Sequence, residues 1–268
     1  MNYPHQNAAN DFLELASEQR LGILLKLLEG KSRITAIAKE MAATVPEVYR
    51  NFERLMKAEL IMKDADGSYD LTTYGKTVCT LVPSLRFVSQ NRKYFKNHDF
   101  GDAPEKFIQR IGALAEGQHI KGFVKVLEQW KDIYKNSDEY ICNILSEVHY
   151  SADLIEPIVD KVKKGVKLNS ILSESAIIPR ERKQILEKLG LKKLVESGRI
   201  ERKMRKDVKM VLVLNEKEAC VLFPTIDGEA DMSEMFYSND SLFHEWCLDY
   251  FKYCWDTSST FQESKLKE

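Results

Sequence analysis

Residues 15–71 decide the fold: LASEQRLGILLKLLEGKSRITAIAKEMAATVPEVYRNFERLMKAELIMKDADGSYDL. Apolar residues recur at helical spacing in three segments of this stretch, and short breaks separate the segments. We expect a first helix between Ser17 and Gly30, a second over residues 36–43, and a third after Thr44. Serine and threonine are good N-caps, glycine often ends a helix, and Pro46 is tolerated in a first turn.

A small hairpin is expected after the three helices. Residues 60–63 have the composition of a strand, residues 64–67 form a turn that contains Gly67, and residues 68–71 form the return strand. Three helices followed by a hairpin is the order of a winged helix-turn-helix, which places one helix in the DNA major groove. The sequence therefore predicts such a DNA-binding domain over residues 11–75, with double-stranded DNA as its partner.

The third helix is the expected recognition helix, with a buried stripe and a polar face on opposite sides. The buried stripe consists of Val45, Val48, Phe52, Leu55 and Met56. The polar face carries Glu47, Tyr49, Arg50, Arg54 and Lys57.

We expect Tyr49 and Arg50 near base edges, and Arg54 and Lys57 near phosphates. Thr44 caps this helix, and Lys63 with the hairpin tip is expected over the DNA backbone or the minor groove. Glu47 can accept a hydrogen bond from a cytosine amine, or it can serve as a first-turn carboxylate that the helix dipole favours. A winged helix used only for protein contacts is the alternative for the whole domain.

The composition is that of a globular protein. The chain has 268 residues, 44% hydrophobic and 30% charged, with a net charge of −1, which argues against wholesale coating of nucleic acid. Between residues 31 and 63, however, seven Lys/Arg face four Glu, a local net charge of +3. The five scattered cysteines show no zinc-ligand spacing. No secretion signal and no membrane-spanning run are recognised, so we expect a cytoplasmic protein.

Residues 76–103 are expected to connect two domains. A helix capped by Thr72 carries an apolar stripe, Val78, Leu81, Leu85 and Val88, and Pro83 should kink or split it. The stripe can pair with its twofold mate in a homodimer, or it can pack back onto its own domain. Residues 91–103 are polar and form the expected linker.

Residues 104–256 alternate strands and helices. Strands are expected at 139–148, 166–172, 199–204, 208–214 and 219–223, and helices at 104–116, 122–134, 152–164, 179–191 and 242–255. Strand-helix-strand order predicts a mostly parallel sheet covered by helices. The whole chain is thus expected to be a two-domain α+β or α/β protein with a flexible tail over residues 257–268.

Two pieces of the sequence carry a family resemblance. TVPEVYRNFERL (44–55) and VLFPTIDGEADMSEMFYSNDSLFHEWCLDYFKYCW (221–255) resemble archaeal winged-helix regulators of the methanogenesis-regulator type. The resemblance extends over residues 12–256 and implies a winged helix followed by a sensor domain. That second domain also resembles, more loosely, the phospholipase-D-like effector domain of the sugar-responsive TrmB regulators.

No catalytic motif accompanies the resemblance. A phospholipase-D site needs H-x-K-x4-D, and after His119 and Lys121 the aspartate position is occupied by Val126. No nucleophile elbow or glycine-rich phosphate loop is present. We therefore expect no enzymatic activity, no catalytic residue, no metal and no cofactor.

A ligand is expected beyond the carboxyl ends of the parallel strands. The candidates are Glu147 and His149 after the first strand, with Asp227 and Asp231 from the conspicuous loop. The alternative is that His149 caps the next helix and Asp227 shapes a turn. The basic run over residues 199–209 is either the solvated face of an edge strand or an anion or extended DNA contact.

Together these features predict a dimeric, sequence-specific DNA-binding transcription regulator whose second domain senses a small-molecule effector. The alternative is a protein-interaction module that binds a transcription factor or another partner and has no specific DNA site.

Overall fold

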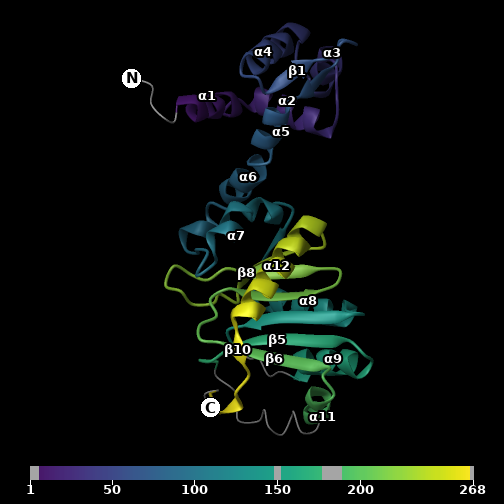
Figure 1. The fold of residues 1–268 in the computed structure, drawn as a ribbon, viewed down its shortest axis with the longest axis vertical. Coiled ribbons are helices and arrows are strands. Elements are labelled where there is room, and N and C mark those ends of the chain that lie inside the picture. The colour runs from purple at the N-terminus through teal and green to yellow at the C-terminus, as the bar shows by residue number, and fades with distance from the viewer. Residues whose placement is uncertain (1–5, 148–151, 177–188, 266–268) are drawn as a thin grey trace. The chain divides into compact units, whose positions relative to one another are not determined.

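A computed structural model describes residues 6–147, 152–176 and 189–265, and the chain divides into two units, Met1–Leu85 and Arg86–Glu268. The first unit contains the three expected helices, α2 (Glu18–Glu29), α3 (Ile34–Glu40) and α4 (Val45–Lys57). The expected hairpin follows them as β1 (Ile61–Lys63) and β2 (Tyr69–Leu71), which pair antiparallel (Figure 1). Ahead of them lies a helix that the sequence did not predict, α1 (Gln6–Leu15).

The core of the first unit is built from the apolar stripes of these helices and the hairpin. Its most buried members are Ile23, Leu24, Leu27, Ile37, Phe52, Leu55 and Leu60. Ring contact between Phe52 and Tyr69, with centroids 4.7 Å apart, fixes α4 against the hairpin. Burial of about seven large apolar side chains is the main term that stabilises this small unit.

The connecting helix is split near Pro83, as expected. It forms α5 (Thr73–Cys79) and α6 (Val82–Gln90), with Pro83 in the first turn of α6, where a missing N–H costs little. The α5 half packs back onto its own unit: a Cβ on Gly75 would lie 1.9 Å from the Leu60 carbonyl oxygen, so only glycine fits there. Leu81 and Leu85, in contrast, are 66% and 64% exposed.

The second unit has one eight-stranded sheet with helices on both faces. Its strands are β3 (Gln118–Lys121), β4 (Tyr140–Leu145), β5 (Lys167–Ser173), β6 (Ile200–Arg205), β7 (Val211–Asn215), β8 (Ala219–Leu222), β9 (Glu234–Ser238) and β10 (Ser259–Thr260). Their order across the sheet is β10-β6-β5-β4-β7-β8-β9-β3.

Helices cover both faces of this sheet (Figure 1). One face packs against α12 (Ser241–Thr257) and the short helices η1 (Tyr94–Lys96), α7 (Glu105–Gln109) and η2 (Ile111–Leu114). The other face packs against α8 (Phe123–Asn136), α9 (Ala152–Lys163) and α11 (Leu191–Glu196). The last short helix of the described chain is η3 (Glu263–Lys265). The predicted helix at 179–191 lies mostly outside the described residues.

The expectation of a mostly parallel sheet holds only for its three-strand part. β4, β5 and β6 pair parallel through the helical crossovers that the sequence pattern indicated, whereas the other described pairings are antiparallel. The reason is that β7, β8 and β9 follow one another without a helix between them, and such connections return the chain antiparallel.

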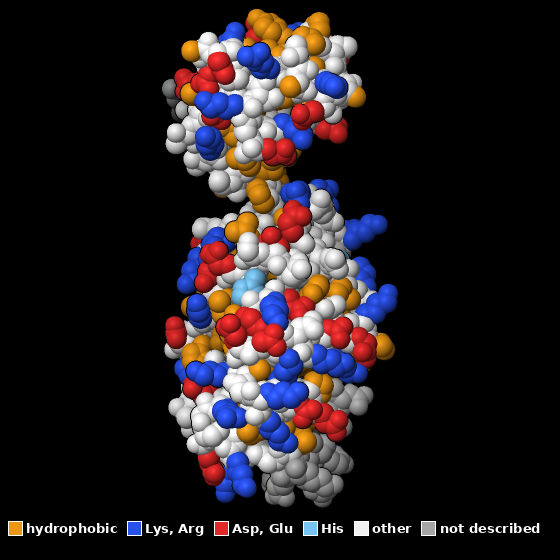
Figure 2. Space-filling view, turned by 90° about the vertical axis from the view of Figure 1, so that its right-hand side faces the viewer, with side chains coloured by type: hydrophobic (Ala, Val, Ile, Leu, Met, Phe, Trp, Pro, Cys, Tyr) orange, Lys and Arg blue, Asp and Glu red, His pale blue; other side chains and the backbone are white. Residues whose placement is uncertain are grey.

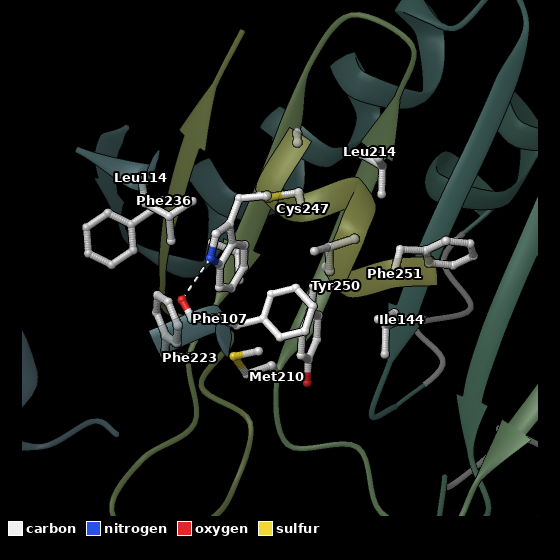
Figure 3. Close-up of a cluster of buried hydrophobic side chains, with 14 of the residues drawn as sticks. Phe107, Leu114, Ile144, Met210, Leu214, Phe223, Phe236, Cys247, Tyr250 and Phe251 are labelled. Carbon is white, nitrogen blue, oxygen red and sulfur yellow. Dashed lines mark hydrogen bonds between the residues drawn. The ribbon is translucent and has the colours of Figure 1, made fainter. Parts of the chain in front are cut away.

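The aromatic helix α12 forms the centre of the larger core (Figure 3). Trp246 and Tyr250 stack with ring centroids 5.7 Å apart, and the Trp246 indole N–H donates to the Phe107 carbonyl at 3.0 Å. Phe223 and Phe236 pack beside them. This hydrogen bond satisfies the polar end of a fully buried tryptophan, as its burial requires.

The segments predicted to be a polar linker and a flexible tail both form part of the second unit. In the expected linker, residues 91–103, Tyr94 is 4% exposed and Phe95 and Phe100 pack on the same core. In the expected tail, Ser259 and Thr260 pair with β6 opposite Met204 and Lys203. Both segments are mostly polar in sequence. Their few aromatic or strand-compatible residues make the contacts with the core and with β6.

Candidate nucleic-acid interface

The start of α4 is fixed by a reciprocal cap between Thr44 and Glu47. The Thr44 backbone N–H and hydroxyl donate to Oε2 of Glu47 at 3.0 and 2.7 Å. These hydrogen bonds, led by that of the hydroxyl, hold the pKa of Glu47 below its usual value. Of the two roles open to Glu47 from the sequence, the structure therefore shows the local one, a carboxylate that closes a capping box.

One face of α4 is buried and the other is open. Val48, Phe52 and Leu55 are at most 2% exposed, as predicted, but Val45 is 46% exposed, which contradicts its assignment to the buried stripe. The cause is its position: Val45 is the first residue of α4, and Cα–Cβ bonds tilt toward the helix N-terminus. The Val45 side chain therefore projects beyond the end of the core.

Arg50 and Tyr49 lie on the open face. Arg50 is exposed and makes no hydrogen bond or ion pair with any described residue. Tyr49 is 48% exposed, and a hydrogen bond from its hydroxyl to Glu53 raises the pKa of Tyr49. Lys57, the last residue of α4, is likewise exposed and makes no hydrogen bond or ion pair within the part of the chain that the structure describes.

Arg54 differs from its neighbours because it has a partner. Its guanidinium lies 2.7 Å from the Glu14 carboxylate of α1, and the same carboxylate pairs with Arg20 at 2.7 Å. The Arg54 side chain is still 56% exposed.

A polar cavity of about 770 Å³ lies between α1, α5 and the end of α4. It is lined by Asn7, Asn10, Asp11, Glu14, Arg54, Lys57, Ala58, Glu59 and Tyr74. The sequence did not predict α1 or the Glu14–Arg54 ion pair. The apolar residues just ahead of Ser17, the N-cap of α2, could have indicated α1.

The hairpin tip mixes both signs of charge. Lys63 lies over the Tyr69 ring, 5.7 Å from its centroid. Lys31 pairs with Asp64, and the Arg33 guanidinium donates to the Asp66 carbonyl at 3.3 Å. The backbone bridge between Ser32 and Tyr69 brings these two further basic residues to the hairpin, a contribution that the sequence analysis did not identify.

The predicted ligand residues of the second unit are not joined to one another. Glu147 is exposed after β4, His149 lies outside the described residues, and Asp227 is exposed in a turn closed by the Gly228 N–H to Thr225 carbonyl bond of 2.8 Å. Among the described residues, no hydrogen bond or ion pair links Glu147 to Asp227 or Asp231. The turn-forming alternative for Asp227 agrees with this geometry.

Asp231 instead binds a histidine that the sequence analysis did not single out. His98 Nε2 lies 2.9 Å from the Asp231 carboxylate, its Nδ1 lies 3.0 Å from the Tyr94 carbonyl, and its ring stacks on Tyr94. Alongside, His119 Nε2 lies 2.7 Å from Glu234, and burial lowers the pKa of His119.

The basic run over residues 199–209 ties chain segments together. Arg199 donates to carbonyls at the end of α9, Lys203 donates to the Trp255 carbonyl at 2.8 Å, and Arg205 pairs with Asp102 at 2.8 Å. Arg202 lies over the Phe261 ring. Lys203 and Arg202 therefore hold the C-terminal segment against β6, whereas Arg199 and Arg205 tie the end of α9 and Asp102 to the same strand region.

Charge on the visible face is mixed in both units, with Lys/Arg and Asp/Glu side chains interspersed (Figure 2). A second polar cavity, of about 650 Å³, lies at the amino end of β4 and is lined in part by Lys135, Asp138, Lys161 and Glu218. Within the described ranges no group of His, Cys, Asp and Glu is arranged to hold a metal ion. Nor is any described helix both long and apolar enough to cross a membrane.

No family model and no curated protein matches the chain. Among solved structures, it is similar to TrmBL2, described as an archaeal chromatin protein with a novel mode of DNA binding, at 12% identity and a TM-score of 0.43, over 91% of this chain and 93% of that one. It is also similar to Nuc, a phospholipase D family member from Salmonella typhimurium, at 13% identity and a TM-score of 0.38, over 55% of this chain and 100% of that one.

A third similarity, to phosphatidylserine synthase from Haemophilus influenzae Rd KW20, has 12% identity and a TM-score of 0.40, over 57% of this chain and 41% of that one. With TM-scores below 0.5, none of these similarities carries an argument about function.

Proposed function

We propose that the chain is a sequence-specific, DNA-binding transcription regulator whose first unit works as a winged helix-turn-helix. The observation that carries the proposal is the open face of α4. There, Arg50 is exposed and makes no hydrogen bond or ion pair with any described residue, on a helix whose start is capped and whose opposite face is buried.

The geometry suits a recognition helix. Three fully or nearly fully buried side chains, Val48, Phe52 and Leu55, anchor α4 to the core and leave its N-terminal half open. Residues at the N-terminal end of such a helix contact base edges, and arginine binds the O6 and N7 atoms of guanine in a bidentate manner. Arg50 thus takes the base-reading role, and Lys57 binds phosphate.

The hairpin takes the role of the wing. Lys31, Arg33 and Lys63 are its exposed basic side chains, of which Lys31 pairs with Asp64 and Arg33 donates to the Asp66 carbonyl. The acidic residues beside them limit nonspecific attraction to phosphates, because each uncompensated carboxylate repels the DNA backbone. Affinity must therefore come from specific contacts and from two copies that bind together.

We place the dimer contact on the exposed stripe of the connecting helix. Leu81, Leu85 and Val88 are 66%, 64% and 37% exposed and recur at helical spacing. A twofold pair of such helices buries both stripes, and paired recognition helices then bind half-sites about one DNA turn apart.

The second unit, in this proposal, binds a small molecule and catalyses no reaction. The loop with Asp227 and Asp231 follows β8, which runs parallel to β4 through β7, so it emerges at the same sheet edge as Glu147. His119 and Lys121, the two residues that match the start of a phospholipase-D motif, both form ion pairs with Glu234. A ligand that favours one spacing of the two winged helices changes DNA affinity by its differential binding energy.

We assign the protein to the cytoplasm.

The experiment is selection of bound sequences from a random DNA pool, followed by affinity measurement for Arg50→Ala. Loss of Arg50 should weaken the selected site by about 1–3 kcal/mol and relax specificity at one position. Arg92→Ala, which removes an exposed arginine from the second unit, is the matched control and should bind like the parent. Failure to enrich any sequence, or equal binding by both variants, contradicts the proposal.

The protein-interaction alternative has one observation in its favour, the exposed apolar residues Val45, Tyr49 and Met62 on the first unit. If that alternative holds, DNA affinity stays weak at physiological salt, and the pool selection yields no consensus sequence.

A further inference from the structure

Two exposed apolar side chains lie at the N-terminal half of α4, on the flank between its buried stripe and Arg50. Val45 and Tyr49 are 46% and 48% exposed. They lie four residues apart, so they share one side of the helix at its N-terminal half. An exposed valine in the first turn of a helix contributes little to the core, and its neighbour Pro46 is exposed as well.

The major groove offers one apolar group to such a pair, the 5-methyl group of thymine. We propose, resting on the proposed function, that Val45 and the Tyr49 ring bind a thymine methyl group next to a guanine read by Arg50. The partner is thus a DNA half-site with a thymine beside a guanine. The Arg50 guanidinium matches the hydrogen-bond acceptors of guanine, and Val45 with the Tyr49 ring matches the methyl group of thymine.

The local structure prepares the pair for this contact. The Thr44–Glu47 capping box fixes the first turn of α4, so Val45 is held in one orientation. The Tyr49 hydroxyl is already bonded to Glu53, so what Tyr49 offers to a base edge is the apolar ring. Charge fits as well, because the cationic Arg50 follows directly and favours the negative potential of the groove.

The test replaces each thymine of the selected site, one at a time, with deoxyuridine, which lacks only the methyl group. Fluorescence anisotropy should show about fourfold weaker binding at one or two positions per half-site, the effect of losing one buried methyl contact. In Val45→Ala the thymine-to-uracil ratio at those positions should fall to about one. Tyr49→Phe, which keeps the ring, should retain the ratio.

Val124→Ala, the same change at a 69% exposed valine of the second unit, is the matched control and should behave like the parent. Circular dichroism verifies that each variant is folded. The inference is overturned if no thymine occurs in the half-site, if uracil substitution is neutral everywhere, or if Val45→Ala leaves the ratio unchanged. Those outcomes leave sequence-specific binding intact, whereas the absence of any selected sequence overturns the proposed function as well.

Discussion

Glu47 is a residue of the proposed recognition helix whose side chain has a structural role. Its carboxylate accepts hydrogen bonds from the Thr44 backbone N–H and hydroxyl, so it closes the capping box of α4. Arg50 and Lys57 on the same helix have no such commitment among the described residues. In the proposed function, Arg50 therefore reads the base, and Glu47 fixes the first turn of the helix that presents it.

The pH dependence of the free energy of unfolding of Glu47→Gln tests whether Glu47 acts as a structural cap. The folded-state pKa of Glu47 is lowered, so its contribution to stability is present above the unfolded pKa of about 4.3 and is lost as pH falls through the folded value. The free energy of unfolding of the parent should exceed that of Glu47→Gln at neutral pH, and the two should converge in acid. Urea unfolding followed by circular dichroism measures this, with tryptophan fluorescence reporting the second unit, which holds Trp130, Trp246 and Trp255.

The same variant decides whether Glu47 reads a cytosine. If the carboxylate is only a cap, the sequence selected by Glu47→Gln from a random DNA pool is that of the parent. A changed base preference at one position would assign Glu47 a direct base contact.

Among the elements, α1 holds one of the basic side chains of α4 that the proposed function places near DNA. The Glu14 carboxylate lies 2.7 Å from both Arg54 and Arg20, so the arginine expected on a phosphate is already neutralised within the unit. The pair is partly buried, since Arg54 is 56% exposed but Glu14 is only 15% exposed. In DNA binding, its effect is on the number of free cations that α4 brings to the backbone.

Glu14→Gln should therefore release Arg54 for phosphate binding. The plot of log affinity against log salt should become steeper by about 0.9, the value for one further phosphate contact on duplex DNA, and affinity at low salt should rise. Glu18→Gln, which removes an exposed carboxylate four residues away, is the control and should leave the slope unchanged. An unchanged slope in Glu14→Gln would mean that Arg54 faces no phosphate in the complex.

The elements also show where sequence reasoning succeeds and where it stops. Caps and helical spacing act within a few residues, which is why the start of α4 and the exposure of Arg50 could be predicted. The Glu14–Arg54 pair spans 40 residues and the His98–Asp231 pair spans 133, so both depend on packing that no local pattern reports. His98 sits in a stretch whose polarity predicted a linker.

For the molecule as a whole, the sequence pattern indicated where several strands lie but not whether they pair parallel or antiparallel. The run of β7, β8 and β9 was partly recognised as strands, yet its antiparallel return depends on connection length rather than on residue type. Val45 was misplaced for a related reason, because periodicity assigns a side chain to a face but does not say where the core ends.

The proposed dimer concerns the whole molecule and has its own test. Leu85→Glu places a charge in the exposed stripe, so it should shift a dimer to monomer in sedimentation velocity without unfolding the chain, since Leu85 is 64% exposed. Binding to a paired site should weaken, and binding to a single half-site should not. Gln90→Glu, on the opposite side of α6 by helical spacing, is the control. A parent that is already monomeric at micromolar concentration would contradict the assigned contact.

The most direct test of the central claim is a footprint on the selected DNA at physiological salt. The parent should protect two half-sites about one helical turn apart, and Arg50→Ala should lose this protection while Arg92→Ala keeps it. A parent without a discrete footprint, or an Arg50→Ala footprint identical to that of the parent, would contradict DNA recognition by α4.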